Sequence, residues 1–230
     1  MKKIIGFLFA LNLYAAFPSW YYNIKDIKEQ KKAFSSILLP LIQKENSKII
    51  VLRKKIINIF NDPYFLLDPK KVEFLAKIAK IYKIKDITNK EEFLKKIDTI
   101  PPSLALAQAA IESGWGKSRF TKEANNLFGH WEYSNNGLKP KSKYDHIKID
   151  YSLKIFPSIE ASIAAYMRNL NRNPAYKKFR DLRYKYHKEH KKFTGLIAAD
   201  TMINYSQLHE KYVELLKKMI KSNHWDKYDN

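Results

Sequence analysis

The sequence predicts a mainly α fold, of the α+β class, in which one small β-rich segment interrupts a series of helices. Apolar residues recur at three- and four-residue spacing through most of the 230 residues, which is the period of an amphipathic helix. Four of the six glycines fall between residues 114 and 137, together with an asparagine–glycine turn signal. Hydrophobic residues make up 45% of the chain, which is enough for a packed core and excludes extensive disorder.

Helices are predicted on both sides of the β-rich segment. The stretch 17–60 has helical periodicity, and Pro40 is expected either to kink this helix or to mark its start. Asn89, Ser103 and Ser158 are expected N-caps, because each precedes a helical pattern and has an oxygen that can accept from the first turn. The other helices are expected at 69–82, 87–97, 104–113, 159–170, 176–191 and 195–221. A β-hairpin or three-stranded sheet is expected over roughly 128–156, where apolar residues alternate.

The first sixteen residues have the pattern of a Sec-type signal peptide. Lys2 and Lys3 precede an apolar run, and the small residues Ala15 and Ala16 follow it. The run is too short for a comfortable membrane span, although an uncleaved anchor or a buried helix is the alternative interpretation. We therefore expect an exported protein of the periplasm or cell envelope, with no membrane span in its mature form.

The charge and composition of the chain limit the classes of partner and cofactor that we expect it to bind. The formal net charge of +20 favours an anionic partner, which for an exported protein includes the cell wall and anionic lipid as well as nucleic acid. The chain has no cysteine, which excludes disulfides, thiol catalysis and cysteine-based metal sites. The six histidines are scattered, and His187 and His190 have no acid at ligand spacing, so neither a metal nor another cofactor is predicted.

The stretch AQAAIESGWGKS, residues 107–118, contains a candidate catalytic acid at the end of a predicted helix. Glu112 lies in the last helical turn, where the helix dipole disfavours a negative charge, and Trp115 would add desolvation if it packed against the carboxyl group. Both effects raise a carboxyl pKa, and an acid that is protonated near neutral pH can donate a proton to a leaving oxygen. Gly114 allows a left-handed helix end, and Gly116 allows close approach of the backbone to a ligand. The alternative is a surface acid beside an ordinary glycine C-cap.

Two longer motifs extend this pattern to a known family. LALAQAAIESGWGKSRF, followed by NNLFGHW, resembles the glucosaminidase family of peptidoglycan hydrolases, glycoside hydrolase family 73, whose domain is the mannosyl-glycoprotein endo-β-N-acetylglucosaminidase-like domain. More narrowly, the sequence resembles the Bax branch. The supporting matches are LLPLIQKEN, NLNRNPAY and NYSQLHEKYV. Together the matches cover most of the chain beyond the signal peptide.

The resemblance implies a lysozyme-like α-lobe with a small β-hairpin lobe that lines a substrate groove. It implies cleavage of the β-1,4 bond after N-acetylglucosamine in peptidoglycan glycan strands, with Glu112 as general acid and Tyr205 as the residue that positions water or the acetamido group. In the alternative interpretation, Tyr205 and Phe128 belong to the core and the asparagines are turn residues. The residues expected to bind substrate are Trp115, Asn125, Asn126, Phe128 and Trp131.

A second catalytic carboxylate is expected from the β-lobe, and the candidates are Glu132, Asp145 and Asp150. Attack by the substrate's own N-acetyl group would need no second carboxylate, so the stereochemical outcome stays open. Glu160 is expected to be structural. One departure concerns the loop after Tyr205, because the chain has His209 where Bax relatives tend to have glycine.

The expected organisation is a signal peptide (1–16), an N-terminal helical region (17–98), a glucosaminidase domain (99–222) and a frayed C-terminal tail (223–230), in a monomer. The alternative functions are a lytic transglycosylase, which shares the helix-terminal acid, and a non-catalytic wall-binding protein, which would not need Glu112. A nucleic-acid binder is disfavoured by the signal peptide and by the absence of any recognisable nucleic-acid-binding motif.

Overall fold

A computed structural model describes residues 17–134, 136–140 and 151–229. The predicted signal peptide and the candidates Asp145 and Asp150 lie outside the described residues. The helices, in chain order, are α1 (Ser19–Tyr22), α2 (Ile27–Phe60), α3 (Pro69–Tyr82), α4 (Lys90–Lys96), α5 (Pro102–Ser113), α6 (Arg119–Ala124), α7 (Ile159–Arg172), α8 (Lys177–Lys188), α9 (Gly195–Ala199) and α10 (Glu210–Ser222). Short 3₁₀ turns are η1 (Phe65–Leu67), η2 (Pro174–Tyr176) and η3 (Asp226–Tyr228).

The β-lobe is a two-stranded antiparallel sheet of β1 (Trp131–Glu132) and β2 (Ser152–Leu153). Trp131 pairs with Leu153 and Glu132 pairs with Ser152, and an isolated bridge joins Leu138 to Leu153. The predicted class, mainly α with one small β-hairpin lobe, is therefore confirmed.

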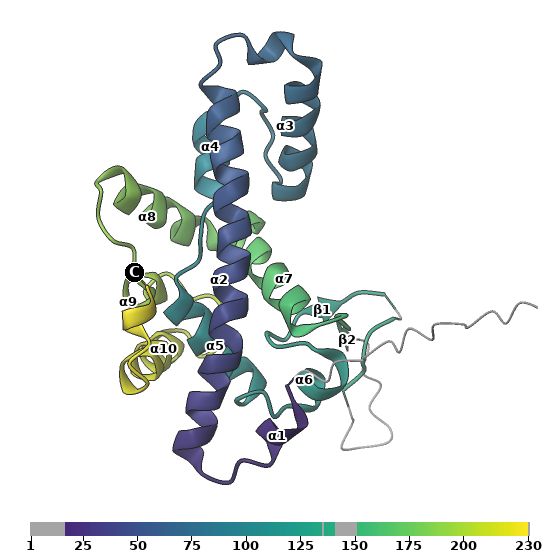
Figure 1. Cartoon of the computed structure of the whole chain (residues 1–230), viewed down its shortest axis with the longest axis vertical. Helices are drawn as coiled ribbons and strands as arrows, with labels where there is room; N and C mark the ends of the chain where they lie inside the picture. The colour runs from purple at the N-terminus through teal and green to yellow at the C-terminus, as the bar shows by residue number, and fades with distance from the viewer. Residues whose placement is uncertain (1–16, 135, 141–150, 230) are drawn as a thin grey trace, which may run out of the picture.

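Helix α2 has 34 residues and runs along the long axis of the molecule (Figure 1). It contacts α4, α5 and α7 along its length, while α3 and α4 lie beside its C-terminal end. The helix continues through Pro40 without starting or ending there, so the proline marks no boundary. Pro40 is exposed to solvent, where water can satisfy the carbonyl group that the missing proline N–H leaves free.

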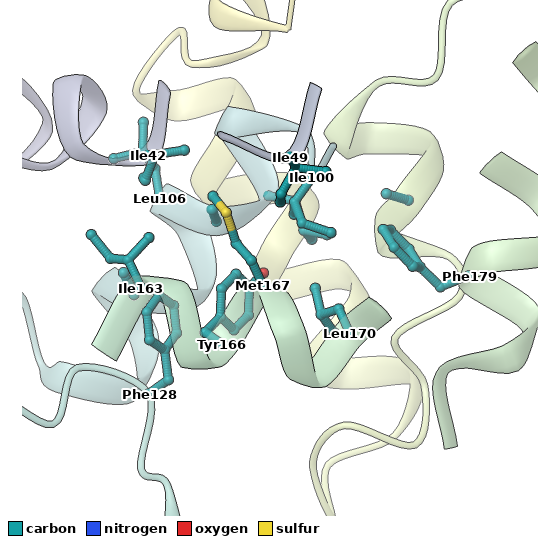
Figure 2. Packing of buried hydrophobic residues seen from close by; sticks show 14 of the residues in the cluster. Ile42, Ile49, Ile100, Leu106, Phe128, Ile163, Tyr166, Met167, Leu170 and Phe179 are labelled. Carbon is teal, nitrogen blue, oxygen red and sulfur yellow. The ribbon is translucent and has the colours of Figure 1, made fainter. Parts of the chain in front are cut away.

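The core lies between α2, α5, α7 and α8 (Figure 2). Side chains of these helices converge there, and the labelled examples are Ile42, Ile49, Leu106, Ile163, Tyr166, Met167, Leu170 and Phe179. Helix α5 is buried around most of its circumference and not on one face only, because α2, α9 and α10 all contact it. Its alanines permit these close approaches, and the end of α5 is thereby held rigidly.

Most of the helix predictions hold, and α4 and α7 have the predicted caps, since Asn89 accepts from Glu92 N–H and Ser158 accepts from Ala161 N–H. The single helix expected over 195–221 is wrong, because α9 ends at Ala199 and α10 begins at Glu210. The intervening turns carry Tyr205. This break places Tyr205 in a loop rather than on a helix face.

The sequence predicted a frayed C-terminal tail, but in the structure these residues are packed against the rest of the chain. Trp225 is 2% exposed, and Asp229 is buried. The Asp229 carboxylate accepts from Ser103 N–H at 2.9 Å, Ser103 O–H at 2.6 Å and Gly195 N–H at 2.7 Å. Ser103 is therefore not the N-cap of α5, which follows Pro101, and Asp229 satisfies the first turns of both α5 and α9. Among the described residues, no helix is both long and apolar enough to cross a bilayer.

Candidate active site

The C-terminal end of α5 is shaped by three consecutive residues with left-handed backbone. Gly114, Trp115 and Gly116 have φ values of 56°, 59° and 72°. A Cβ atom at Gly116 would lie 2.5 Å from the ring of Phe17, so only glycine fits there. The side chain of Ser113 fastens this turn, because its oxygen accepts from Gly116 N–H at 2.7 Å.

The side chain of Trp115 packs against the core. The indole lies 5.3 Å from the ring of Phe34 and 5.8 Å from that of Trp225, and Tyr21 O–H donates to the Trp115 carbonyl at 2.7 Å. Trp115 does not line the groove described below. Its predicted roles in binding substrate and in desolvating Glu112 therefore have no support in its position.

Glu112 is desolvated by other neighbours. Its side chain is largely buried yet reaches the groove, and burial raises the pKa of its carboxyl group. Tyr212 O–H donates to Glu112 Oε1 at 2.7 Å, and this bond acts in the opposite direction because it favours the ionised form. The net shift is upward, as the sequence predicted. The cause is burial of the carboxyl group, whose hydrogen-bond partner is Tyr212.

A chain of buried hydrogen bonds supports the acid from behind. Tyr166 O–H donates to Gln108 Oε1 at 2.5 Å, and Gln108 Nε2 donates to the Tyr212 oxygen at 3.3 Å. Because the Gln108 amide group occupies the Tyr212 oxygen as a donor, the Tyr212 proton is free to point at Glu112. The order of donors thus runs in one direction, from Tyr166 to the carboxyl group. Tyr166 and Gln108 are both buried, which holds this order in place.

A groove of about 630 Å³ opens in front of Glu112. Its walls come from α7, from the start of the β-lobe and from the loop after α9. The lining residues are Lys83, Glu112, Phe128, Gly129, His130, Trp131, Tyr133, Lys154, Ala165, Arg168, Asn169, Arg172, Asn173, Tyr176 and Tyr205. Polar and aromatic residues together make up this lining, a composition that suits the binding of sugar rings.

Aromatic residues of the β-lobe line the groove. Trp131 is 55% exposed and stacks on Tyr151 at 4.7 Å between ring centroids, and Tyr133 is fully exposed nearby. Phe128 also lines the groove, but it is 5% exposed and stacks on Tyr166 at 3.9 Å (Figure 2). Phe128 is thus a core residue with one edge at the groove, whereas Trp131 is a surface platform.

Tyr205 lies at the groove beside the acid's hydrogen-bond partner. Its ring stacks on that of Tyr212, with centroids 5.5 Å apart and planes at 5°, and it lies 5.9 Å from Tyr176. Burial raises the pKa of Tyr205 well above its ordinary value, so the hydroxyl group stays protonated and neutral. The structure therefore brings Tyr205 and Glu112 together at one site.

Asn125 and Asn126 hold the β-lobe and do not line the groove. The Asn126 amide donates to the carbonyl groups of His130 at 2.8 Å and Lys154 at 2.9 Å, and its oxygen accepts from His130 N–H at 2.9 Å. Asn125 ends α6 with a φ of 51°, and its amide donates to the Phe156 carbonyl at 2.9 Å. Their positions agree with the alternative interpretation, in which these asparagines are turn residues.

Among the described residues, Glu112 is the one carboxylate that lines the groove. Glu132 lies on β1 between Trp131 and Tyr133, which both line it, and its carboxylate accepts from Ser134 N–H at 3.1 Å. Hydrogen bonds from Ser134 lower the pKa of Glu132, so this acid is ionised near neutral pH. Glu160 pairs with Lys44 and Lys48 outside the groove, which is a structural role.

No group of three or more potential metal ligands occurs within the described ranges. His187, which sequence spacing left without an acidic neighbour, contacts the buried Asp98 through Nδ1 at 2.9 Å. Arg53 and Arg183 also lie within ion-pair distance of the Asp98 carboxylate, so this acid belongs to a structural charge cluster.

Sequence reasoning missed Tyr212, Gln108 and Tyr166. Gln108 precedes Glu112 by four residues and so shares its helix face, a spacing that was visible in the sequence. Tyr212 lies in the quoted NYSQLHEKYV match, seven residues after Tyr205. The distance in sequence between α5 and α10 hid the contact between their side chains.

A largely buried acid with a raised pKa, set in an aromatic and polar groove, defines a site of the glycoside hydrolase class. The chain belongs to the glucosaminidase family, since the family model described as mannosyl-glycoprotein endo-beta-N-acetylglucosaminidase matches residues 89–225. It is 31% identical over 199 residues to Protein bax of Escherichia coli strain K12, which covers 84% of this chain and 70% of that protein. It is also similar to the solved catalytic domain of the autolysin Auto from Listeria monocytogenes, with 24% identity, a TM-score of 0.44, and coverage of 68% of this chain and 85% of that domain.

Proposed function

We propose that this protein is a peptidoglycan hydrolase, an endo-β-N-acetylglucosaminidase that cleaves the β-1,4 bond after N-acetylglucosamine. The observation that carries the proposal is the carboxyl group of Glu112, which reaches the groove with its pKa raised by burial. The family membership supports the reaction class. The signal-peptide pattern supports export to the periplasm or cell envelope, where a monomer would meet glycan strands rather than nucleic acid.

In the proposed reaction, protonated Glu112 donates its proton to the bridging oxygen as the bond from that oxygen to the anomeric carbon breaks. Positive charge then develops on the sugar ring. Tyr212 and the buried chain behind it orient the acid. Tyr205, neutral at the groove surface, has the position to orient water or the acetamido group. The sugar faces would stack on Trp131 and Tyr133.

Two kinds of group could stabilise the developing positive charge, and each defines a route. In the first route, a second carboxylate does so, and the remaining sequence candidates are Asp145 and Asp150. In the second, the acetamido group of the substrate attacks the anomeric carbon. Glu132 is not among the residues that line the groove, so the other routes are favoured.

The direct test is digestion of purified sacculi by Glu112→Gln. We expect release of soluble fragments to fall by at least about a hundredfold, as is typical when a general acid is lost, while sacculus binding and the circular dichroism spectrum are retained. Glu214→Gln, which changes an exposed acid of α10, is the matched control and should digest normally. Near-normal digestion by Glu112→Gln would refute the assignment of the acid.

Mass spectrometry of the released fragments identifies the bond that is cut. A reducing-end N-acetylglucosamine supports the proposal. A 1,6-anhydromuramic end identifies a lytic transglycosylase instead, and tight binding to sacculi with no released fragment identifies a wall-binding protein. The three outcomes are chemically distinct.

A further inference from the structure

The groove that contains Glu112 is strongly cationic. Lys83, Lys154, Arg168 and Arg172 all line it, and Glu112 is the one carboxylate among its described lining residues. The ring of His130 also lines the groove, but burial, with a smaller contribution from Lys154, lowers its pKa to about 4. The histidine is therefore neutral near pH 7, and the groove charge comes from lysine and arginine.

Two of these cations lie on one stripe of α7. Arg168 and Arg172 are four residues apart, so their side chains project from the same face of the helix, together with Ala165 and Asn169. The opposite stripe of α7 is buried in the core, with Tyr166 among its members (Figure 2). The packing of that buried stripe fixes the rotation of α7 and thereby keeps both guanidinium groups at the groove.

A neighbouring cleft provides an internal comparison, because it shares Lys83 and Arg172 with the groove. Three other lysines of that cleft are each neutralised by an acid one helical turn away. The pairs are Lys95–Glu91 at 2.7 Å, Lys96–Glu92 at 2.7 Å and Lys177–Asp181 at 2.5 Å. By contrast, within the described ranges neither Arg168 nor Arg172 has an acid within ion-pair distance. These two positive charges are thus available to a ligand.

We propose that Arg168 and Arg172, with Lys83 beside them, form a subsite for the carboxylates of the peptide stems that peptidoglycan carries. This inference rests on the proposed function. N-acetylglucosamine is uncharged and offers no anion to a guanidinium group, whereas the stems carry free carboxylates at short intervals along the strand. Arginine binds carboxylate through two parallel N–H donors, which gives orientation as well as attraction. The subsite would thus make this enzyme prefer stem-bearing strands.

The test compares soluble glycan strands with intact stems and the same strands after their carboxyl groups are converted to amides. Amidation keeps the sugar, the peptide and the length but removes the negative charge. We expect wild-type protein to favour intact strands by roughly three- to tenfold in kcat/KM at low salt, the size expected for two partly exposed ion pairs. The preference should shrink as salt is added.

The double variant Arg168→Gln, Arg172→Gln should bring this ratio close to one. The matched control is Lys28→Gln, Lys32→Gln, which removes two exposed cations at the same spacing on α2, outside the groove lining. It should keep the wild-type ratio. If the double variant does not fold, Arg168→Gln alone, at an exposed position, should lower the ratio by part of the full effect.

A wild-type ratio near one, or a ratio that survives in the double variant, would overturn the subsite. Failure of the proposed function looks different, since the strands would then either stay uncut or be released with an end other than N-acetylglucosamine. For that case, binding of intact and amidated strands to Glu112→Gln, measured by fluorescence anisotropy, reports the same ratio without cleavage. Equal affinity for the two strands would sink the subsite whatever the protein catalyses.

Discussion

The hydroxyl group of Tyr212 on α10 donates a hydrogen bond of 2.7 Å to Oε1 of Glu112 at the end of α5. Burial raises the pKa of Glu112, and this hydrogen bond lowers it by a smaller amount. The tyrosine thus both orients the acid and limits how firmly it keeps its proton.

Tyr212→Phe should move the alkaline limb of activity to higher pH. The hydroxyl group stabilises the ionised carboxylate, so its loss raises the pKa of Glu112 further. A general acid works while protonated, and activity falls as pH rises through its pKa, so a higher pKa carries that fall to higher pH. The measurement is kcat/KM against pH on soluble glycan strands. Tyr184→Phe, which removes a hydroxyl group on α8 outside the groove lining, should leave the profile unchanged. An unchanged alkaline limb would show that the bond does not act on Glu112, and a shift to lower pH would show that it favours the protonated form.

Asn126→Ala should lower stability rather than simply weaken substrate binding. The variant loses three hydrogen bonds and leaves the His130 N–H and the Lys154 carbonyl unpaired at the base of the β-lobe, while the His130 carbonyl keeps its bond from Lys154 N–H. We expect a loss of about 3 kcal/mol in the free energy of unfolding, at about 1 kcal/mol for each bond, measured by urea denaturation. Ser134→Ala, on the exposed side of the same lobe, should cost far less. An unchanged unfolding midpoint with a raised KM would instead make Asn126 a substrate ligand.

His209→Gly should stabilise the loop that carries Tyr205. His209 has φ 48° and ψ −117°, a conformation that glycine adopts without the steric cost that a side chain brings. Relief of this strain, offset by the greater freedom of glycine in the unfolded chain, should raise the free energy of unfolding by about 1 kcal/mol. His209→Ala is the control, because alanine keeps the strain and removes only the imidazole. If alanine stabilises as much as glycine, the side chain rather than the backbone is the cause.

Local sequence signals were sufficient for the elements with strong caps and clean periodicity. Asn89 and Ser158 predicted the starts of α4 and α7, and the glycine at 114 predicted the left-handed end of α5. The prediction failed at Ser103, because the acid that serves the start of α5 comes from Asp229, more than a hundred residues away. Capping from a distant residue leaves no local trace in the sequence.

The residues of the site likewise include some that the sequence placed and some that it did not. Sequence placed Glu112 at a helix end and Tyr205 in a supporting motif, and both line one groove. Trp115 shows the limit of this reasoning, because a tryptophan beside an acid in sequence says nothing about the direction of its side chain. Three successive positive φ values turn the indole toward Phe34 and Trp225 instead.

The sequence by itself determined the mainly α class, the positions of most helices and the excess of basic residues, and it supplied Glu112 as the candidate acid. Only the tertiary structure decided which side chains surround that acid, that the asparagines support the β-lobe, and that the guanidinium groups of α7 face the groove. The physical reason is range. Helical period and capping act within a few residues, whereas burial, hydrogen bonding and charge at the site depend on α5, α7 and α10, which only the folded chain brings together.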